Sequence, residues 1–325
     1  MKNCDVCGTI NFDENNYCIH CGNKLLMGEV CPNCGSVNEN SAEYCSVCSF
    51  QLKSVVINDF ESLFTDFNRQ LLQNAQINDM EYNEILSDIF MRADYIDIHG
   101  KNIKNKILNF VSSFTRCLPK SRGYERGYIF FGNGIFYDDR LDDSVQIATI
   151  IHEFAHYILF SIIENLLCKI FKVNTSTTLQ SFVWYFLTLP EFKIMNEYCA
   201  HTVEGRFIPY GYQNYGSFNA LVKEMGLKGE YLDNMIVLGN SFANEIIIYL
   251  EKYIDNSLRD EIKLQYKKDL ATPSFESLLR ETDDCLHLNI KNNLIIGVLN
   301  EVFLELSDDD IIRELESIKE SIELC

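Results

Sequence analysis

The sequence predicts an α+β protein that is predominantly helical, with a small antiparallel sheet and two small metal-binding modules at its N-terminus. Three observations lead to this prediction. Four Cys-x-x-Cys pairs fall within the first 53 residues, and apolar residues recur at helical spacing over most of the remaining chain. Between the helical stretches, aromatic and β-branched residues flank Gly132-Asn133-Gly134, which is typical of a hairpin.

Acidic residues are in excess along the whole chain of 325 residues, and the formal net charge is −19 at pH 7. Because a phosphate backbone would be repelled, we do not expect a nucleic-acid partner. The N-terminus carries no apolar run of the kind found in signal peptides, and the longest apolar stretches contain ionisable residues or are too short to cross a bilayer. We therefore expect a cytoplasmic location, reduced thiols and no membrane segment.

The first 53 residues contain an internal repeat of cysteine pairs, with ten residues between the two pairs of each half. The eight cysteines are Cys4, Cys7, Cys18 and Cys21 in the first half and Cys31, Cys34, Cys45 and Cys48 in the second. Units of this size cannot bury a core, so bound metal must supply folding free energy, roughly 10 kcal/mol or more per site. The spacing alone leaves open whether each half binds its own ion or the two halves share ligands.

This segment, especially CPNCGSVNENSAEYCSVCSFQL, resembles the tandem zinc-ribbon modules found at the ends of many prokaryotic proteins. The resemblance implies two structural zinc ions, one held by the first four cysteines and the other by the second four. Acidic modules with aromatic residues such as Phe12 and Phe50 favour a protein partner over DNA.

The elements that follow are predicted from apolar periodicity. The first helical stripe consists of Phe60, Leu63, Phe64, Phe67 and Leu71, and the second of Tyr82, Ile85, Leu86, Ile89, Phe90, Ala93 and Ile96. Residues 124–137 predict the antiparallel ribbon, and a capping box at Asp143 and Gln146 predicts the start of a long apolar helix. From about residue 225 the chain is predicted to be helical again, with Ile311, Leu315, Ile318 and Ile322 on one face of its last helix.

The long apolar helix contains the motif His152-Glu153-Phe154-Ala155-His156. Residues four apart share a helix face, so His152 and His156 can present two imidazoles to one metal ion with Glu153 beside them. Two nitrogen ligands suit zinc, and an open position on the metal can hold water. Glu153 could then act as the general base in metal-assisted hydrolysis, as in the zincin peptidases, which this motif resembles.

The third ligand must come from elsewhere in the chain. Leu159 and Ile162 stand where a metzincin would need glycine and histidine, which excludes that subclass. In the pairing of HEFAH with Glu197-x-x-Ala200, the sequence resembles the gluzincins and the compact ImmA/IrrE-type peptidases. This resemblance implies that His152, His156 and Glu197 bind a catalytic zinc ion and that Glu153 is the base.

Several alternatives stay open at this point. His201 could be the third ligand, with Glu197 supporting it, and further candidate ligands are Glu164, Glu191 and Glu204. If His201 does not bind zinc, it could stabilise the oxyanion as a catalytic residue, a task that Tyr198 or Arg206 could also perform.

These observations predict five segments. They are a first zinc ribbon at 1–26, a second at 27–53, a helical segment at 54–120, a zincin-like catalytic core at 121–225 and a C-terminal helical region at 226–325. The predicted function is zinc-dependent endopeptidase activity on a protein or peptide substrate, with ribbons that recognise a protein. The alternative is a non-catalytic regulatory or scaffold protein in which the zincin-like fold and its zinc are structural.

Overall fold

A computed structural model of the chain divides it into two compact units, one of residues 1–56 with 172–174 and one of residues 57–171 with 175–325. The structure describes residues 2–3, 6–11, 17–23, 29–31, 34–38, 42, 45–48, 55–91, 102–114, 119–121, 126–130, 134–270, 275–306 and 309–324.

The smaller unit contains two antiparallel hairpins, as the internal repeat predicts. β1 (Lys2–Asn3) pairs with β2 (Ile10–Asn11), and β3 (Glu29–Val30) pairs with β4 (Val37–Asn38). In both hairpins a buried asparagine ends the second strand, and its Oδ1 accepts a backbone N–H from the next cysteine turn. Asn11 accepts from Ile19 at 2.9 Å, and Asn38 accepts from Ser46 at 2.8 Å. The repeat in the sequence is therefore a repeat in the structure.

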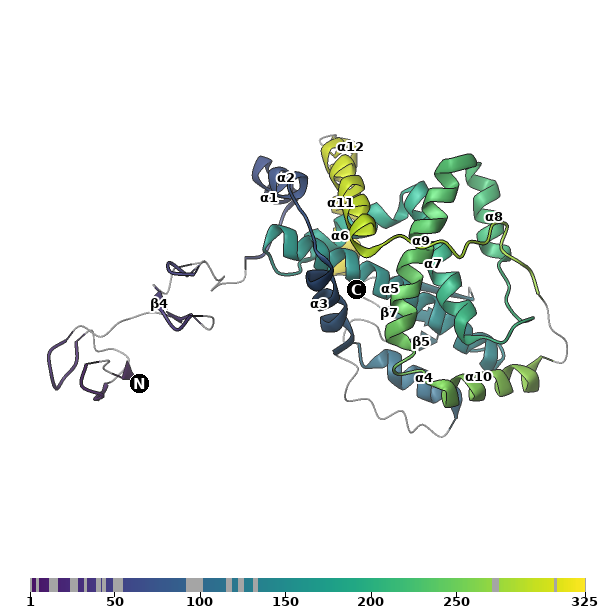
Figure 1. The fold of residues 1–325 in the computed structure, drawn as a ribbon, viewed down its shortest axis with the longest axis horizontal. Coiled ribbons are helices and arrows are strands. Elements are labelled where there is room, and N and C mark those ends of the chain that lie inside the picture. The colour runs from purple at the N-terminus through teal and green to yellow at the C-terminus, as the bar shows by residue number, and fades with distance from the viewer. Residues whose placement is uncertain are drawn as a thin grey trace. The chain divides into compact units, whose positions relative to one another are not determined.

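Helices make up most of the larger unit (Figure 1). The first four are α1 (Phe60–Leu63), α2 (Asp66–Gln73), α3 (Asp79–Phe90) and α4 (Ile103–Ser112). The next four are α5 (Asp143–Phe171), α6 (Thr177–Thr188), α7 (Pro190–Phe207) and α8 (Gly216–Met225). The last four are α9 (Gly229–Leu250), α10 (Asn256–Asp269), α11 (Leu288–Glu305) and α12 (Asp309–Glu323).

The core of the larger unit is built around α5, which packs against α3, α4, α7 and α10. By length and composition α5 could cross a membrane, but 83% of its apolar window is buried inside the protein, as in the core helix of a globular unit. On its other side α7 packs against α9 at Gly239, where a Cβ would lie 2.6 Å from the Met195 carbonyl oxygen. A glycine at that position allows the two backbones to approach closely.

The sheet is mixed, whereas the sequence predicted an antiparallel one. β6 (Gly127–Phe130) and β7 (Gly134–Tyr137) form the predicted antiparallel pair, and residues 131–133 between them lie outside the described residues. The additional strand, β5 (Lys120–Ser121), pairs in parallel with β7, so the order is β5-β7-β6. Two exposed residues, Lys and Ser, have neither the alternation nor the β-branched side chains that would predict a strand.

Three further predictions need correction or fall outside the description. The first apolar stripe is broken because Thr65 caps a new helix, which leaves Phe67 68% exposed. The capping box at Asp143 and Gln146 is not formed, since the Gln146 amide donates to the Asp139 and Leu141 carbonyls. In the second stripe the residues from Tyr82 to Phe90 are buried as predicted, whereas Ala93 and Ile96 lie outside the described residues.

Candidate metal centre

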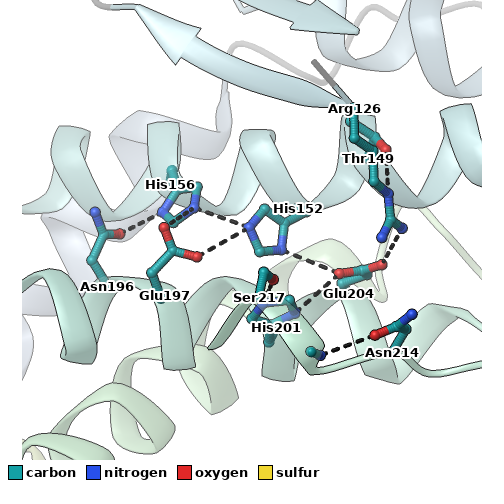
Figure 2. A network of polar contacts seen from close by, with 11 residues as sticks. Arg126, Thr149, His152, His156, Asn196, Glu197, His201, Glu204, Asn214 and Ser217 are labelled. Carbon is teal, nitrogen blue, oxygen red and sulfur yellow. Dashed lines mark hydrogen bonds and ion pairs between the residues drawn. The ribbon is translucent and has the colours of Figure 1, made fainter. Parts of the chain in front are cut away.

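Helices α5 and α7 bring the three predicted ligands of the larger unit together (Figure 2). His152 and His156 are one turn apart on α5, and their Nε2 atoms lie 3.1 Å from each other. Glu197 on α7 points its carboxylate at both rings. Its Oε2 lies 3.6 Å from His152 Nε2, and its Oε1 lies 3.8 Å from His156 Nε2.

These separations suit a tetrahedral zinc site. Ligand atoms placed about 2.1 Å from a tetrahedral zinc ion lie about 3.4 Å from one another. The three donor separations range from 3.1 to 3.8 Å, so small side-chain shifts would place all donors around one ion. Two imidazole nitrogens and one carboxylate oxygen are also a donor set that zinc accepts.

Both histidines are oriented by a second contact through the other ring nitrogen. Nδ1 of His152 lies 3.2 Å from Glu204 Oε2, and Nδ1 of His156 lies 2.7 Å from Asn196 Oδ1. Because these oxygens accept hydrogen bonds, each Nδ1 carries a proton, and Nε2 is the atom of each ring that faces Glu197 and could bind a metal ion. This pattern of outer contacts is typical of metal-binding histidines.

Glu204 also forms an ion pair with an arginine that lies outside α5 and α7. Arg126, just before β6, donates from one Nη to Glu204 Oε1 at 3.3 Å and from Nε to Thr149 Oγ1 at 3.1 Å. Burial alone would raise the pKa of Glu204, but its contacts with His152 and His201 hold that pKa well below its usual range. The carboxylate is therefore charged and fixed on several sides.

From the sequence, Glu204 was predicted only as an alternative ligand, and Arg126 was not predicted to belong to the site. Glu204 lies seven residues after Glu197, two helical turns along the same face, and this spacing is a signal that could have indicated its role. The position of Arg126 could not be found in this way, because its contact with Glu204 joins residues 78 positions apart.

His201, the predicted catalytic residue and alternative ligand, is 3% exposed and lies beside the cluster. Its Nε2 is 3.0 Å from Ser217 Oγ, and its Nδ1 is 3.4 Å from Glu204 Oε2. His152, Glu197 and His201 each offer one ligand atom within 4.8 Å of the others. However, both His201 nitrogens face other side chains, so the geometry favours His156 as the partner of His152 and Glu197.

The other candidates raised from the sequence lie elsewhere. Glu164 is buried and accepts hydrogen bonds from Thr175 and Gln180. Tyr198 accepts at its hydroxyl from the Thr282 backbone N–H at 3.2 Å, and Arg206 pairs with Glu251 at 2.7 Å. Neither these residues nor Glu191 are among the side chains that line the cavity at the cluster.

A cavity of about 610 Å³ opens over the cluster. Its lining is formed by Arg126, Gly127, Tyr128, Ile129, Thr149, His152, Glu153, His156, Trp184, Leu187, Thr188, Lys193, Asn196, Glu197, His201, Glu204, Asn214 and Ser217. Glu153, the predicted base, therefore lines the same cavity as the candidate ligands His152, His156 and Glu197. A volume of this size is typical of a small-molecule or peptide site.

Burial and charge set the protonation of the central groups. Burial raises the pKa of Glu153 to about 7. Burial lowers the pKa of His156 to about 4, whereas contacts with Glu197 and Glu204 outweigh burial and raise the pKa of His152 to about 10. Burial also opposes ionisation of Glu197, but its contacts with His152 and His156 lower its pKa to about 2. Glu197 is therefore an ionised carboxylate beside a protonated His152 and a neutral His156.

Strand β6 lies directly against the helix that carries the motif. A Cβ at Gly127 would lie 2.1 Å from Thr149 Cγ2 and 3.2 Å from Glu153 Oε1. Only glycine allows the strand to come this close. Among the described residues β6 pairs with β7 and with no second strand, and Gly127 brings the β6 backbone next to Glu153.

In the smaller unit, the structure groups the cysteines by halves. Cys31, Cys34, Cys45 and Cys48 form one cluster, and Cys7, Cys18 and Cys21 form another, each with ligand atoms within 4.8 Å. The predicted fourth ligand, Cys4, lies outside the described residues. Sulfur pairs 3.5 to 3.6 Å apart are near the separation of about 3.8 Å expected around tetrahedral zinc. This grouping corresponds to one ion per half.

Hydroxyl groups near two of these thiols favour the thiolate form that binds zinc. A hydrogen bond with Thr9 lowers the pKa of Cys7 to about 5, and one with Ser36 lowers the pKa of Cys45 to about 5. Thiolates are the form that coordinates metal, so the local hydrogen bonds prepare the clusters for it.

Comparison with known proteins identifies one family, and only at the N-terminus. Residues 4–49 match the model of the double zinc ribbon family. The match and the cysteine clusters together support zinc binding by this segment. No curated protein and no solved structure matches the chain.

Proposed function

We propose that the protein is a zinc-dependent endopeptidase that hydrolyses peptide bonds of a protein or peptide substrate, with Glu153 as general base. The observation that carries this proposal is the convergence of His152, His156 and Glu197 in one cavity that also holds Glu153. His152, His156 and Glu197 would hold the ion. Zinc, when bound, would polarise the scissile carbonyl and make water more acidic.

The protein groups fit the proton transfers that this reaction needs. Glu153 accepts a proton from the attacking water and then donates it to the leaving amine. A base of this kind works best when its pKa is close to the working pH, and burial raises the pKa of Glu153 to about 7. Glu204 and Asn196 keep the two histidines in one tautomer throughout.

An extended peptide would suit the edge of β6 that faces away from β7. Gly127, Tyr128 and Ile129 line the cavity, and β6 pairs only with β7 among the described residues. A peptide added to this edge would form main-chain hydrogen bonds, which hold a substrate regardless of its side chains. Because Gly127 is next to Glu153, such a peptide would pass over the base.

For the zinc ribbons we propose a role in recognising a protein partner in the cytoplasm. Four large apolar side chains of the first ribbon are exposed by 60 to 68%: Val6, Ile10, Tyr17 and Ile19. Such side chains favour contact with another protein, and the acidic charge of the chain disfavours nucleic acid. Phe12 and Phe50, which the sequence suggested for this contact, lie outside the described residues.

The proposal is tested by comparing the native chain with Glu153→Ala and with the control Glu191→Ala, whose side chain does not line the cavity. Zinc content is measured by mass spectrometry, and new peptide ends are sought in a mixture of unfolded proteins. We expect three zinc ions in all three proteins and cleavage by the native chain and the control only. Two ions in the native chain would refute a metal at the cavity, whereas three ions without cleavage would favour the scaffold alternative.

A further inference from the structure

We infer that Ile129, Trp184 and Leu187 form a subsite that selects one large apolar side chain, aromatic or aliphatic, of an extended peptide. This inference rests on the proposed peptidase function and adds the class of substrate side chain. The three residues line the same cavity as the metal-binding atoms.

The apolar part of the cavity comes from two elements only. Ile129 and its neighbour Tyr128 belong to β6, and Trp184 and Leu187 belong to the last turns of α6. Trp184 and Leu187 are three residues apart, so they lie on the same face of α6. Most of the remaining lining residues are charged or polar and come mainly from α5, α7 and the segment around Asn214. The cavity therefore has a distinct apolar portion.

The Trp184 ring packs against a second aromatic residue. Its ring meets Phe130 edge to face, with centroids 6.1 Å apart. Trp184 and Phe130 also line a second cavity of about 150 Å³, whose other walls are Ser317, Ile318, Ser321 and Ile322 of α12. The indole thus forms a partition between the two cavities. A rigid aromatic wall of this kind offers a large contact area at little entropic cost.

The proximity of β6 explains why a single peptide side chain would be selected. Successive side chains of an extended peptide point to opposite faces, and those on one face repeat at roughly 6.6 Å. Ile129 is a single position of β6, and only one peptide side chain on the cavity face can lie beside it at a time, together with Trp184 and Leu187. An apolar side chain would gain binding free energy from burial there, whereas a charged side chain would lose its hydration next to Trp184 and Leu187.

The subsite can be tested by binding, without cleavage. Trp184 is the only tryptophan of the chain, so its fluorescence reports on this wall alone. The zinc-loaded Glu153→Gln variant is titrated with blocked ten-residue peptides of Gly, Ser and Ala that carry one central Phe, Leu, Ser or Asp. We expect a saturable blue shift with Phe and Leu, and dissociation constants at least about tenfold lower than with Ser or Asp.

Substitutions then locate the preference. In the same Glu153→Gln background, calorimetry should show that Trp184→Ala reduces the Phe-to-Ser affinity ratio to within about threefold, that Trp184→Phe keeps most of it, and that zinc content is unchanged. Tyr185→Ala, which alters the neighbouring α6 residue outside the cavity, should keep the full ratio. Equal affinity for all four peptides, absence of binding, or an unchanged ratio in Trp184→Ala would overturn the inference.

The two proposals fail in different ways. Preferential binding of Phe and Leu peptides by a chain that cleaves nothing would support the subsite and count against the peptidase. Cleavage by the native chain with equal affinity for Phe and Ser peptides would support the peptidase and overturn the subsite.

Discussion

Nδ1 of His152 lies 3.2 Å from Oε2 of Glu204, while Nε2 of the same ring faces Glu197 at 3.6 Å. The His152 imidazole thus lies between two carboxylates that are two turns apart on α7. Glu204 is 5% exposed and also accepts a hydrogen bond from Arg126, so contacts within the fold hold its carboxylate in position.

The first prediction concerns this contact. Glu204→Gln keeps the shape of the side chain but removes the charge that orients His152, so we expect zinc affinity at the cavity to fall about 10- to 100-fold. Competition with a chelator measures this affinity, and the two ribbon ions serve as an internal reference. The matched control is Glu251→Gln, which alters a carboxylate paired with Arg206 and Arg259 away from the cavity. Equal affinity in the native chain and Glu204→Gln would contradict the assigned role.

The second prediction separates the two candidates for the third ligand. Because Glu197 faces both Nε2 atoms and His201 faces Ser217 and Glu204, Glu197→Ala should lose the third zinc ion and His201→Ala should retain it. Metal content of each purified variant gives the answer. The reverse result, with the ion lost only in His201→Ala, would assign the site to the histidine.

The third prediction concerns the approach of β6 to α5. A Cβ at position 127 would lie 2.1 Å from Thr149 Cγ2, so Gly127→Ala should lower the free energy of unfolding by about 1 to 3 kcal/mol. Thr149→Ser removes that methyl group and keeps the hydroxyl that Arg126 contacts. Urea unfolding of the double variant should therefore show partial recovery. Strictly additive effects of the two substitutions would mean that the clash is relieved elsewhere.

The fourth prediction concerns a buried cation away from the cavity. Lys291 is fully buried and binds Glu245 at 2.5 Å, above the ring of Tyr82 and close to Cys199 and Asp79. Burial lowers the pKa of Lys291 to about 8. The ordinary pKa of lysine, 10.5, applies to the unfolded chain. Between pH 8 and 10.5 the unfolded chain therefore keeps the Lys291 proton while the folded chain loses it, so the free energy of unfolding rises with pH.

Lys291→Met isolates this effect. We expect the variant to be less stable at pH 7, because Glu245 loses its partner. The native chain should gain about 2 kcal/mol relative to the variant between pH 7 and 9.5. Denaturant unfolding at several pH values measures the free energy of unfolding of both proteins. If the difference between them did not change with pH, the pKa of Lys291 would not be lowered in the folded state.

The fifth prediction concerns the ribbons. Since Cys31, Cys34, Cys45 and Cys48 form one cluster, Cys31→Ser should lose one zinc ion and leave the ion of the first ribbon in place. Metal content together with reactivity of the remaining thiols measures this. Loss of both ribbon ions from the single substitution would indicate ligands shared between the halves.

Local patterns account for the features that the sequence predicted correctly. The spacing of the Cys-x-x-Cys pairs, the helical period around HEFAH and the aromatic runs at 127–130 and 134–137 all act within a few residues. The first apolar stripe failed because the hydrogen bond from Asn68 N to Thr65 Oγ1 starts a new helix and outweighs the continuity of the pattern.

By itself the sequence determined the cysteine clusters, the predominantly helical character and the one-turn spacing of His152 and His156, because each depends on residues that are neighbours along one element. Only the tertiary structure decided that Glu197 faces both histidines, that Glu204 and Arg126 support His152 and that Trp184 shares their cavity. These contacts join residues on different elements. Their geometry is set by the packing of α5 against α7 and β6, which no local spacing encodes.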